Sequence, residues 1–340
     1  MGIDIGTTSI KIGIFDAEGR CIALTSNEIT LERPRPGWIE QDMFEIWKVV
    51  CRLIRHVLRS IPPNKIVAIG LSGQSGGLWL VDENGKPVRK GITWLDQRSS
   101  DIVKDVELAR KFYELTGWRL LPGQTMAILK WIYDHERDSL KKSRYLLRCK
   151  DWVKLCLTGS ICTDYTDMST GLLDPKTGNY SLELFELFGI DMKYSSLLPP
   201  LMNSWSICGE VSDKAARETG LVKSTPVVSG SYDVCSSALG AGVINNYQAF
   251  AIIGTAGIYS IVIDRLILDP NRIISVSYHC VPKRYVLNCQ SMLATPALTW
   301  FINEFCKDLV LEARSKGVSI YELCEEIVSR TEPLSGGVLF

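Results

Sequence analysis

Apolar residues recur along this chain with two different periods, and each period predicts one kind of element. From residue 3 to residue 15, short apolar runs stand on both sides of Gly6-Thr7-Thr8-Ser9, a pattern that predicts two strands joined by a tight bend. From residue 42 to residue 61 the apolar residues follow helical spacing; they are Phe44, Trp47, Val50, Leu53, Ile54 and Val57. Asp42, with Glu45 three residues later, predicts a capping box at the start of this helix.

The same two periods predict the elements of the remaining chain. Strands are predicted over residues 66–71, 78–81 and 226–229, and the apolar stretch 249–263 predicts two strands around a turn. Helices are predicted over residues 99–116, 125–136, 151–157, 233–239, 297–306 and 320–331. Strands that alternate with helices in this way predict an α/β architecture.

A short internal repeat relates the beginning of the chain to a segment near residue 254. When the sequence is shifted by 248 positions, Ile253-Gly254-Thr255 falls on Ile5-Gly6-Thr7, and two further positions are identical. One interpretation is that short Gly-Thr hairpins recur by chance. The other is a duplicated fold in which each half opens with the same phosphate-binding hairpin.

The first bend offers hydrogen-bond donors that suit the oxygens of a phosphate group. Gly6, Thr7 and Thr8 bring backbone amides and hydroxyl groups into one tight turn, and such preorganised dipoles bind phosphate without a strong positive field. Lys11 adds a charge at the edge of the bend. Asp4 stands where a carboxylate could hold Mg²⁺ through the water molecules of the ion.

The second bend, at Gly254 and Thr255, lacks the charged residues of the first. Ile252 takes the place of Asp4, and Tyr259 takes the place of Lys11. A metal ion would therefore lie on the first bend only, while the second bend would hold the phosphates from the other side. For each bend alone, the alternative is that its glycine only allows a tight hairpin.

Asp233 lies among small residues, between a predicted strand and a predicted helix. Gly230-Ser231 precede it, and Ser236-Ser237-Ala238 follow it, so other backbone segments and a substrate can approach closely. A carboxylate at this junction could accept the proton of an attacking hydroxyl group, because phosphoryl transfer asks little of a base beyond orientation. The alternative is that Asp233 only caps the following helix, since Asp is a favoured N-cap residue.

A third group of polar residues lies at the ends of two predicted strands. Gln74, Ser75 and Gly76 follow the first, and Asp96 and Arg98 follow the second. Together they provide the mixed donors and acceptors that a polyhydroxylated ligand needs. For Asp96 and Arg98 the alternative is a surface ion pair or a cap of the next helix.

The bulk composition excludes several classes of protein. The 38 basic side chains balance the 38 acidic ones, so no net field favours nucleic acid or an anionic membrane. The 11 cysteines and 3 histidines show no metal-finger or redox spacing. We find no secretory signal, and the longest apolar stretch is too short for a membrane span, so we expect a cytoplasmic protein with reduced thiols.

Taken together, these motifs resemble the FGGY family of carbohydrate kinases, in which they occur in the same order. The segments that carry the resemblance are residues 4–11, 36–42, 70–74, 94–98, 150–159, 230–233 and 253–255. The resemblance implies an actin-like (ribonuclease H-like) ATPase fold with two related domains and a cleft between them. It also implies transfer of the γ-phosphate of ATP to a sugar hydroxyl, with Mg²⁺ bound beside the nucleotide, and it is compatible with a homodimer.

The resemblance also assigns roles to residues. Asp233 would be the catalytic base, and Asp4 and Asp233 would lie near the metal. The phosphate- and nucleotide-binding residues would be Gly6, Thr7, Thr8, Lys11, Gly254 and Thr255. The substrate-binding residues would be Gln74, Ser75, Gly76, Asp96, Arg98 and Asp233.

The subgroup that this chain resembles contains the ketopentose kinases, namely xylulokinase and the L-xylulose and 3-keto-L-gulonate kinases. Xylulokinases commonly have methionine and histidine where this chain has Ser75 and Gly76, which removes an imidazole and enlarges the pocket. Residues 334–340 suggest a turn entering a strand, whereas the family continues with most of a second domain. We therefore expect a sugar-binding domain over 1–243, the start of a truncated nucleotide-binding domain over 244–340, and weak nucleotide binding by this chain alone.

Other functions fit parts of the pattern. A kinase of another polyol or sugar, such as glycerol, erythritol or ribulose, would need the same phosphate-binding motifs. An actin-like chaperone ATPase could share the fold, but it would lack the small-molecule pocket predicted around Gln74, Asp96 and Arg98. A non-catalytic sugar-binding regulator is less consistent with the presence of both Asp4 and Asp233.

Overall fold

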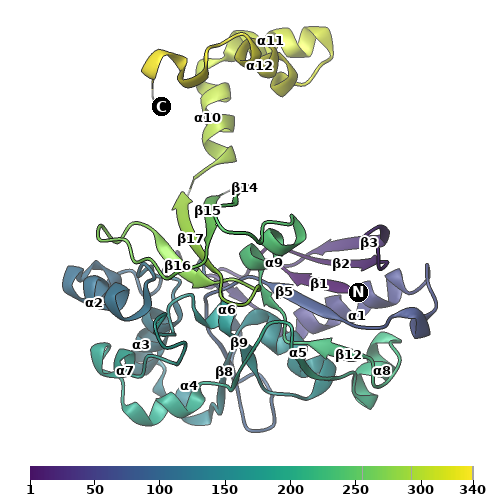
Figure 1. Ribbon diagram of the computed structural model, residues 1–340, viewed down its shortest axis with the longest axis vertical. Helices are drawn as coiled ribbons and strands as arrows, with labels where there is room; N and C mark the ends of the chain where they lie inside the picture. The colour runs from purple at the N-terminus through teal and green to yellow at the C-terminus, as the bar shows by residue number, and fades with distance from the viewer. Residues whose placement is uncertain (255, 292, 339–340) are drawn as a thin grey trace. The chain divides into compact units, whose positions relative to one another are not determined.

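The computed structural model describes residues 1–254, 256–291 and 293–338 of the chain (Figure 1). The contacts divide the chain into two compact units. The first unit contains Met1–Phe250 and Ser260–Cys289, and the second contains Ala251–Tyr259 and Gln290–Phe340. Both units combine helices and strands, as the α/β prediction requires.

A mixed five-stranded sheet forms the centre of the first unit, in the order β13-β5-β1-β2-β3. Its strands are β1 (Gly2–Ile5), β2 (Ser9–Phe15), β3 (Cys21–Glu28), β5 (Gly70–Gly73) and β13 (Ser231–Tyr232). β2 runs antiparallel to its neighbours β1 and β3, whereas β1, β5 and β13 run parallel to one another. Parallel strands need crossover connections, and the chain between them supplies helices.

The register of this sheet brings three strand ends to the same edge. Ile5 pairs with Gly73, and Tyr232 also pairs with Gly73. The next residue of each strand is Gly6, Gln74 or Asp233, respectively. Residues that are far apart in the sequence therefore meet where the three parallel strands end.

One face of the sheet packs against helices to form the first hydrophobic core. In β2 the buried residues Ile10, Ile12 and Ile14 alternate along the strand, as expected for a sheet with one covered face. They pack with α1 (Met43–Val57) and α5 (Cys149–Thr158). This packing holds the sheet, and with it the three strand ends, in a fixed position.

A second hydrophobic core in the same unit lies around α3 (Thr125–His135) and includes Phe112, Leu129 and Phe185. The elements around it are β6 (Trp79–Val81), β8 (Tyr145–Leu147), α2 (Val106–Thr116), α4 (Arg137–Lys142) and α7 (Glu183–Leu187). The remaining elements of the first part of the chain are β4 (Glu40–Gln41), β7 (Gly91–Ile92), β9 (Thr163–Asp164), α6 (Tyr165–Met168), β10 (Leu201–Met202), β11 (Ile207–Glu210), α8 (Asp213–Thr219), β12 (Pro226–Val228) and α9 (Asp233–Gly240).

A second sheet has the strand order β14-β15-β17-β16. Its strands are β14 (Ala249–Ile253), β15 (Gly257–Ile263), β16 (Ser275–Tyr278) and β17 (Tyr285–Ser291). Of this sheet, β16 and most of β15 and β17 belong to the first unit, and most of β14 belongs to the second. The helices of the second unit are α10 (Thr295–Phe305), α11 (Lys307–Lys316) and α12 (Ile320–Ser329). Many apolar side chains on these helices are exposed; examples are Leu298, Phe305, Leu311, Ile327 and Val328.

Several sequence predictions are confirmed. The first Gly-Thr segment lies between β1 and β2, and two strands, β14 and β15, form within the apolar stretch 249–263. α1 begins after Asp42, whose carboxylate accepts from the amides of Phe44 and Glu45. The predicted return bond from the Glu45 side chain is absent from the described part of the chain, so the capping box is incomplete.

Other boundaries were predicted wrongly. The helix predicted over 99–116 begins only at Val106, because Asp105 caps α2 by accepting from the amides of Glu107 and Leu108. The strand predicted over 66–71 is instead β5, at Gly70–Gly73. The turn predicted near the end is present as a 3₁₀ turn at Pro333–Gly337, whereas the strand predicted after it falls on residues 339 and 340, which lie outside the described part.

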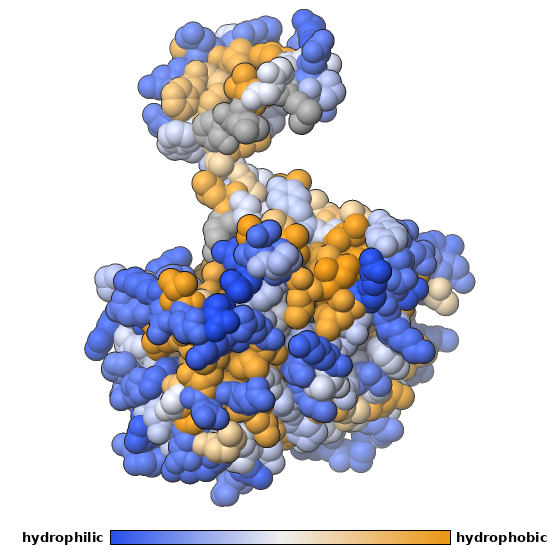
Figure 2. Space-filling model, turned by 60° about the vertical axis from the view of Figure 1, so that its left-hand side comes forward, coloured by the Kyte–Doolittle hydropathy of each residue, from blue (hydrophilic) through white to orange (hydrophobic). Residues whose placement is uncertain are grey.

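The surface combines hydrophilic and hydrophobic side chains. On the face in Figure 2, hydrophilic side chains surround smaller hydrophobic areas. Of the helices that the structure describes, none combines the length and the apolar character that crossing a membrane requires.

Candidate functional site

Four of the predicted residues lie at the aligned ends of β1, β5 and β13, and we call them the strand-end site: Asp4, Gln74, Ser75 and Asp233. Asp4 lies on β1, Gln74 and Ser75 follow β5, and Asp233 follows β13. Sheet register therefore brings together the carboxylate predicted to bind metal, the polar groups predicted to bind substrate and the candidate base.

Asp233 is the first residue of α9 and is half-buried. The N-cap of this helix is Tyr232, so the alternative role of Asp233 as the N-cap residue is not supported. Its carboxylate accepts from the amide of Val234 at 2.8 Å. Burial, and then the nearby negative charge of Asp4, raises the pKa of Asp233 to about 7. A carboxyl group with this pKa can take up and release a proton near neutral pH.

The strand that carries Asp233 can hardly move relative to β5. Gly230, just before β13, has a φ of +79°, and a Cβ atom there would lie 2.2 Å from the carbonyl oxygen of Leu71. Only glycine allows so close an approach with this backbone conformation. The position of Asp233 is therefore set by direct backbone packing.

Asp4 has one carboxylate oxygen available for a ligand. Its Oδ1 is buried, and no hydrogen-bond partner for it exists within the described residues. Asp4 and the exposed Lys11 line a groove of about 740 Å³, together with Ser72 and Ser231. Mg²⁺ prefers oxygen ligands and usually takes only one or two carboxylates from a protein. The unpaired oxygen of Asp4 fits such an ion.

The first bend is connected to Gln74 by a chain of hydrogen bonds. Trp94 Nε1 donates to Thr7 Oγ1, and Gln41 Nε2 donates to the Thr7 carbonyl oxygen, both at 2.8 Å. Gln74 Nε2 then donates to Gln41 Oε1, also at 2.8 Å. Gln74 Oε1 is buried and has no partner among the described residues. This oxygen remains available to a hydroxyl group of a ligand.

Within the bend itself, not every backbone amide is free. The Gly6 amide donates to the Ser9 carbonyl oxygen at 3.0 Å, which closes the turn. The amides of Thr7 and Thr8 have no such partner in the part of the chain that the structure describes. The bend can therefore offer two amides, and the Lys11 ammonium is not engaged by any described carboxylate.

Ser75 and Gly76 form the wall beyond Gln74. Ser75 Oγ donates to Asp167 Oδ1 at 2.7 Å and lies 2.8 Å from Thr170 Oγ1. Gly76 has a φ of +76°, and a Cβ atom there would lie 3.0 Å from Cβ of Trp94. The Ser75 side chain is thus fixed by hydrogen bonds to Asp167 and Thr170. The sequence analysis missed Asp167, because no motif connects it with Ser75.

Asp96 and Arg98 are placed differently from the strand-end site. Both side chains are fully buried, and Arg98 Nε lies 2.8 Å from Asp96 Oδ1. Arg98 Nη2 also lies 2.6 Å from Glu40 Oε1, and the guanidinium group lies over the Trp38 ring at 4.2 Å. The surface ion pair that we considered as an alternative is therefore a buried ion pair. Arg98 Nη1 has no hydrogen-bond partner within the described residues, so a role near the sugar stays a prediction.

The second bend belongs to the second unit. The Gly254 amide donates to the Ala256 carbonyl oxygen at 3.0 Å, and the Gly254 carbonyl oxygen accepts from the amide and the hydroxyl group of Thr295. Thr255 lies outside the described residues. Joint binding of phosphate by the two bends stays a prediction.

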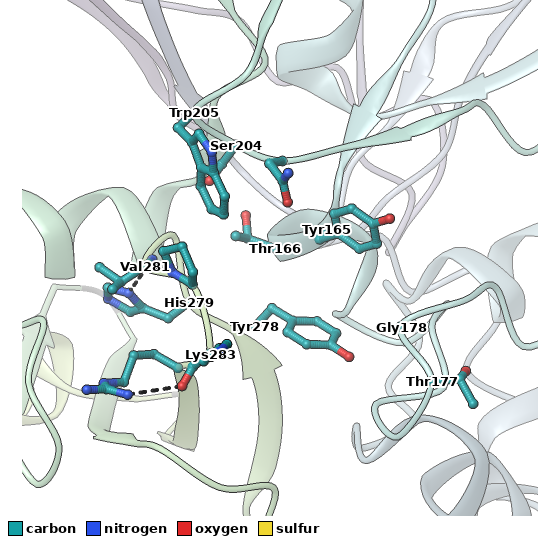
Figure 3. Close-up of a pocket in the computed structure, with 13 residues that line it drawn as sticks. Tyr165, Thr166, Thr177, Gly178, Ser204, Trp205, Tyr278, His279, Val281 and Lys283 are labelled. Atoms are coloured by element: carbon teal, nitrogen blue, oxygen red, sulfur yellow. Dashed lines mark hydrogen bonds between the residues drawn. The ribbon is translucent and has the colours of Figure 1, made fainter.

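A separate pocket of about 360 Å³ lies in the first unit, and none of the predicted site residues lines it. Figure 3 shows Tyr165, Tyr278 and Trp205 around this pocket, with Thr166 among them. Thr166 matters for the strand-end site, because its hydroxyl oxygen accepts from the amide of Tyr232 at 3.3 Å.

Comparisons with known proteins identify the family of this chain. The profile of the FGGY family of carbohydrate kinases, N-terminal domain, matches residues 1–240. A probable L-xylulose kinase from Haemophilus influenzae is 31% identical over 348 residues, covering 100% of this chain and 69% of that protein. The L-xylulose/3-keto-L-gulonate kinase of Escherichia coli is 34% identical over 266 residues, covering 76% of this chain and 53% of that protein.

The fold has a close match among solved structures. The crystal structure of xylulose kinase from Rhodospirillum rubrum superposes with a TM-score of 0.87 and 25% identity, covering 98% of this chain and 67% of that one. The chain thus spans about two thirds of the length of that structure, and the actin-like fold prediction is confirmed. On the profile match and the identity to these relatives, this chain belongs to the FGGY family of carbohydrate kinases.

Proposed function

We propose that the protein is an ATP-dependent carbohydrate kinase that transfers the γ-phosphate to a hydroxyl group of a small sugar. The observation that supports this proposal most directly is the alignment of β1, β5 and β13. Through it, an unpaired carboxylate oxygen of Asp4, an unpaired amide oxygen of Gln74 and the carboxyl group of Asp233 belong to neighbouring strand ends.

In this proposal Asp233 orients the acceptor hydroxyl and takes its proton. Its pKa of about 7, caused first by burial and then by the charge of Asp4, suits proton transfer near neutral pH. The transition state of phosphoryl transfer is loose, so the base needs correct placement more than strength. The tight packing at Gly230 provides that placement.

Asp4, the first bend and Lys11 bind the phosphate end in this proposal. Mg²⁺, when bound, neutralises charge on the phosphate oxygens, and the unpaired oxygen of Asp4 would hold it through water. The amides of Thr7 and Thr8 would donate to phosphate oxygens, with Gly254 and Thr255 of the second bend acting on the same nucleotide. Residues 1–243 would then bind the sugar, and residues 244–340 would begin the nucleotide-binding domain.

We infer that the acceptor is a ketopentose such as xylulose, or a related keto-sugar, because the relatives above are named for such substrates. Ser75 and Gly76 stand where xylulokinases commonly have larger residues, so the sugar substituent recognised at these positions would differ from that of the xylulokinases. Gln74 Oε1, and Arg98 Nη1 if the sugar reaches it, would bind sugar hydroxyl groups. All 11 cysteines are free thiols, which supports a cytoplasmic location; a homodimer is a further expectation.

A panel of acceptors tests the proposal. ADP release should depend on adding one of a series of ketopentoses, ketohexoses, tetritols or glycerol, and it should require Mg²⁺. The control omits the sugar. If no sugar stimulates ADP release and unfolded peptide does, the protein is an ATPase of another class and the proposal is wrong.

A further inference from the structure

Six buried charged side chains lie close to the strand-end site, and we call them the ionic cluster: Arg148, Lys150, Asp151, Lys154, Asp164 and Asp167. They come from the start of α5, from β9 and from α6. None of the six side chains has any solvent-exposed surface. Three are basic and three are acidic, so the formal charge of the cluster is zero.

Lys150 is at the centre of the cluster. Its Nζ lies 2.8 Å from Oδ1 of Asp151, 2.8 Å from Oδ1 of Asp164 and 3.3 Å from Oδ2 of Asp167. Arg148 Nε lies 3.3 Å from Asp167 Oδ1. Buried charges must be paired in this way, because an unpaired charge in the interior is costly.

The cluster is hydrogen-bonded to residues beside two of the three strands of the strand-end site, β5 and β13. On the side of β5, Asp167 accepts from Ser75 Oγ at 2.7 Å. Before β13, Lys154 Nζ donates to Ser229 Oγ at 3.2 Å. At β13 itself, Thr166 Oγ1 donates to Asp164 Oδ2 at 2.5 Å and accepts from the Tyr232 amide at 3.3 Å.

Stability alone does not account for so many buried charges. Well-packed apolar side chains in place of buried ion pairs often leave stability unchanged or higher. Ionic hydrogen bonds, however, have defined lengths and directions, and they can fix the separation of two elements. Here the two elements carry Ser75 and Asp233.

We propose that the ionic cluster positions Asp233 relative to Ser75. The cluster reaches β13 through the hydroxyl group of Thr166, and it reaches Ser75 through the hydrogen bond that Asp167 accepts. The inference rests on the proposed kinase function of the same site. The residues of the ionic cluster act on the proposed site through Tyr232 and Ser75, so they are positioning residues. Because the cluster fixes geometry, its disturbance lowers kcat more than it raises the KM of the sugar.

The chain offers a matched pair of threonines for a test. Thr166→Val removes the hydroxyl group that joins Asp164 to the Tyr232 amide while the side-chain shape is kept. Thr163→Val is the control, because Thr163 is equally buried and neighbours Asp164, but its Oγ1 has no hydrogen-bond partner in the described chain. Thr166→Ser keeps the hydroxyl group.

We expect Thr166→Val to lower kcat by about 10-fold, with the sugar KM changed by less than about 3-fold. Thr163→Val should keep kcat, and Thr166→Ser should recover it to within about 3-fold. Thermal unfolding of each variant measures stability separately. If Thr166→Val does not fold, Ser229→Ala provides the same test through Lys154, with the same direction expected.

An unchanged kcat in a folded Thr166→Val or Ser229→Ala variant would overturn the positioning role. So would a loss of kcat shared equally by Thr163→Val. If the unsubstituted protein, assayed at an ATP concentration high enough to offset the expected weak nucleotide binding, releases no ADP in response to any sugar, the proposed function itself fails. This result is distinguishable because it precedes every substitution.

Discussion

The strand-end site and the Asp96–Arg98 pair both withdraw carboxylates from solvent, but they use the carboxylate oxygens differently. Asp96 accepts from the Ile39 amide and from three nitrogens of Arg98, so its hydrogen-bonding capacity is largely consumed within the protein. Asp4 Oδ1 has no partner in the described chain, and Asp233 accepts only from Val234 there. Unused capacity in a preformed position indicates ligand binding, whereas consumed capacity indicates a structural support.

The largest effect on activity should come from Asp233. Asp233→Asn should lower kcat by about 1,000-fold, because the amide cannot accept the proton of the acceptor hydroxyl. Sugar binding, measured by calorimetry, should change only a few-fold. Asp213→Asn, on an exposed carboxylate, is the control. A variant with wild-type turnover would remove Asp233 from the role of base.

The largest effect on stability should come from Arg98. Arg98→Met should lower the free energy of unfolding by about 3–5 kcal/mol, because it leaves the buried charge of Asp96 without an ionic partner, whereas Glu40 keeps its ion pair with Arg89. Urea denaturation measures this value, and Arg110→Met, in an exposed ion pair, should cost less than about 1 kcal/mol. If Arg98→Met is stable and loses sugar affinity instead, Arg98 binds substrate directly and the contrast drawn above is wrong.

Asp4 should have a smaller effect on activity than Asp233. Asp4→Asn should lower kcat by about 10- to 100-fold, as is typical for residues that hold a metal through its outer shell. The Mg²⁺ concentration needed for half-maximal rate should increase. An exposed carboxylate changed in Asp101→Asn serves as the control, and an unaltered Mg²⁺ dependence in Asp4→Asn would separate Asp4 from the metal.

The smallest effect concerns pH in the absence of metal and nucleotide. The pKa of Asp233 is about 7 in the folded chain, against an ordinary value of 3.8. At a pH between these two pKa values, Asp233 keeps its proton in the folded state and releases it in the unfolded state. The free energy of unfolding therefore falls as pH rises through this range.

Asn at position 233 has no such proton to lose. The stability of Asp233→Asn relative to the unsubstituted protein should therefore be higher at pH 8 than at pH 4. We expect a difference of about 1–2 kcal/mol, since solvent reaches part of this carboxyl group. Denaturation at the two pH values in EDTA measures it, and a difference that does not depend on pH would contradict the burial of the charge.

Local patterns in the sequence predict those parts of the fold that depend on neighbouring residues. The strands around Gly6 and the helix after Asp42 are confirmed because alternation and helical spacing are visible within one segment. The start of α2 was misplaced because the cap at Asp105 interrupts an otherwise continuous pattern. In the case of β5, pairing with β1 and β13 at Gly70–Gly73 decides its position, and no local pattern reveals that pairing.

The ionic cluster could not be predicted from one sequence. Lysine and arginine are rarely buried, so nothing in the sequence marks Arg148, Lys150 and Lys154 as interior residues. Their partners Asp164 and Asp167 lie on other elements, and only the fold brings them together. The strand-end residues were predicted because their motifs contain groups with a recognisable chemistry. Lys150, Asp151 and Lys154 lie in one of the motifs as well, but the pairing of Lys150 with Asp164 and Asp167 depends on the fold.

The left-handed backbone at Gly76 limits how the acceptor preference of this enzyme could be altered. Any side chain at position 76 would strain the backbone and crowd Trp94. A larger residue therefore cannot be introduced at this position to alter the proposed sugar site, even though related kinases carry one there. Libraries aimed at a new sugar should hold position 76 constant and vary Ser75. Each replacement at position 75 would have to keep the hydrogen bond to Asp167, because Asp167 also pairs with the buried Arg148 and Lys150 and cannot be varied without breaking these buried ion pairs.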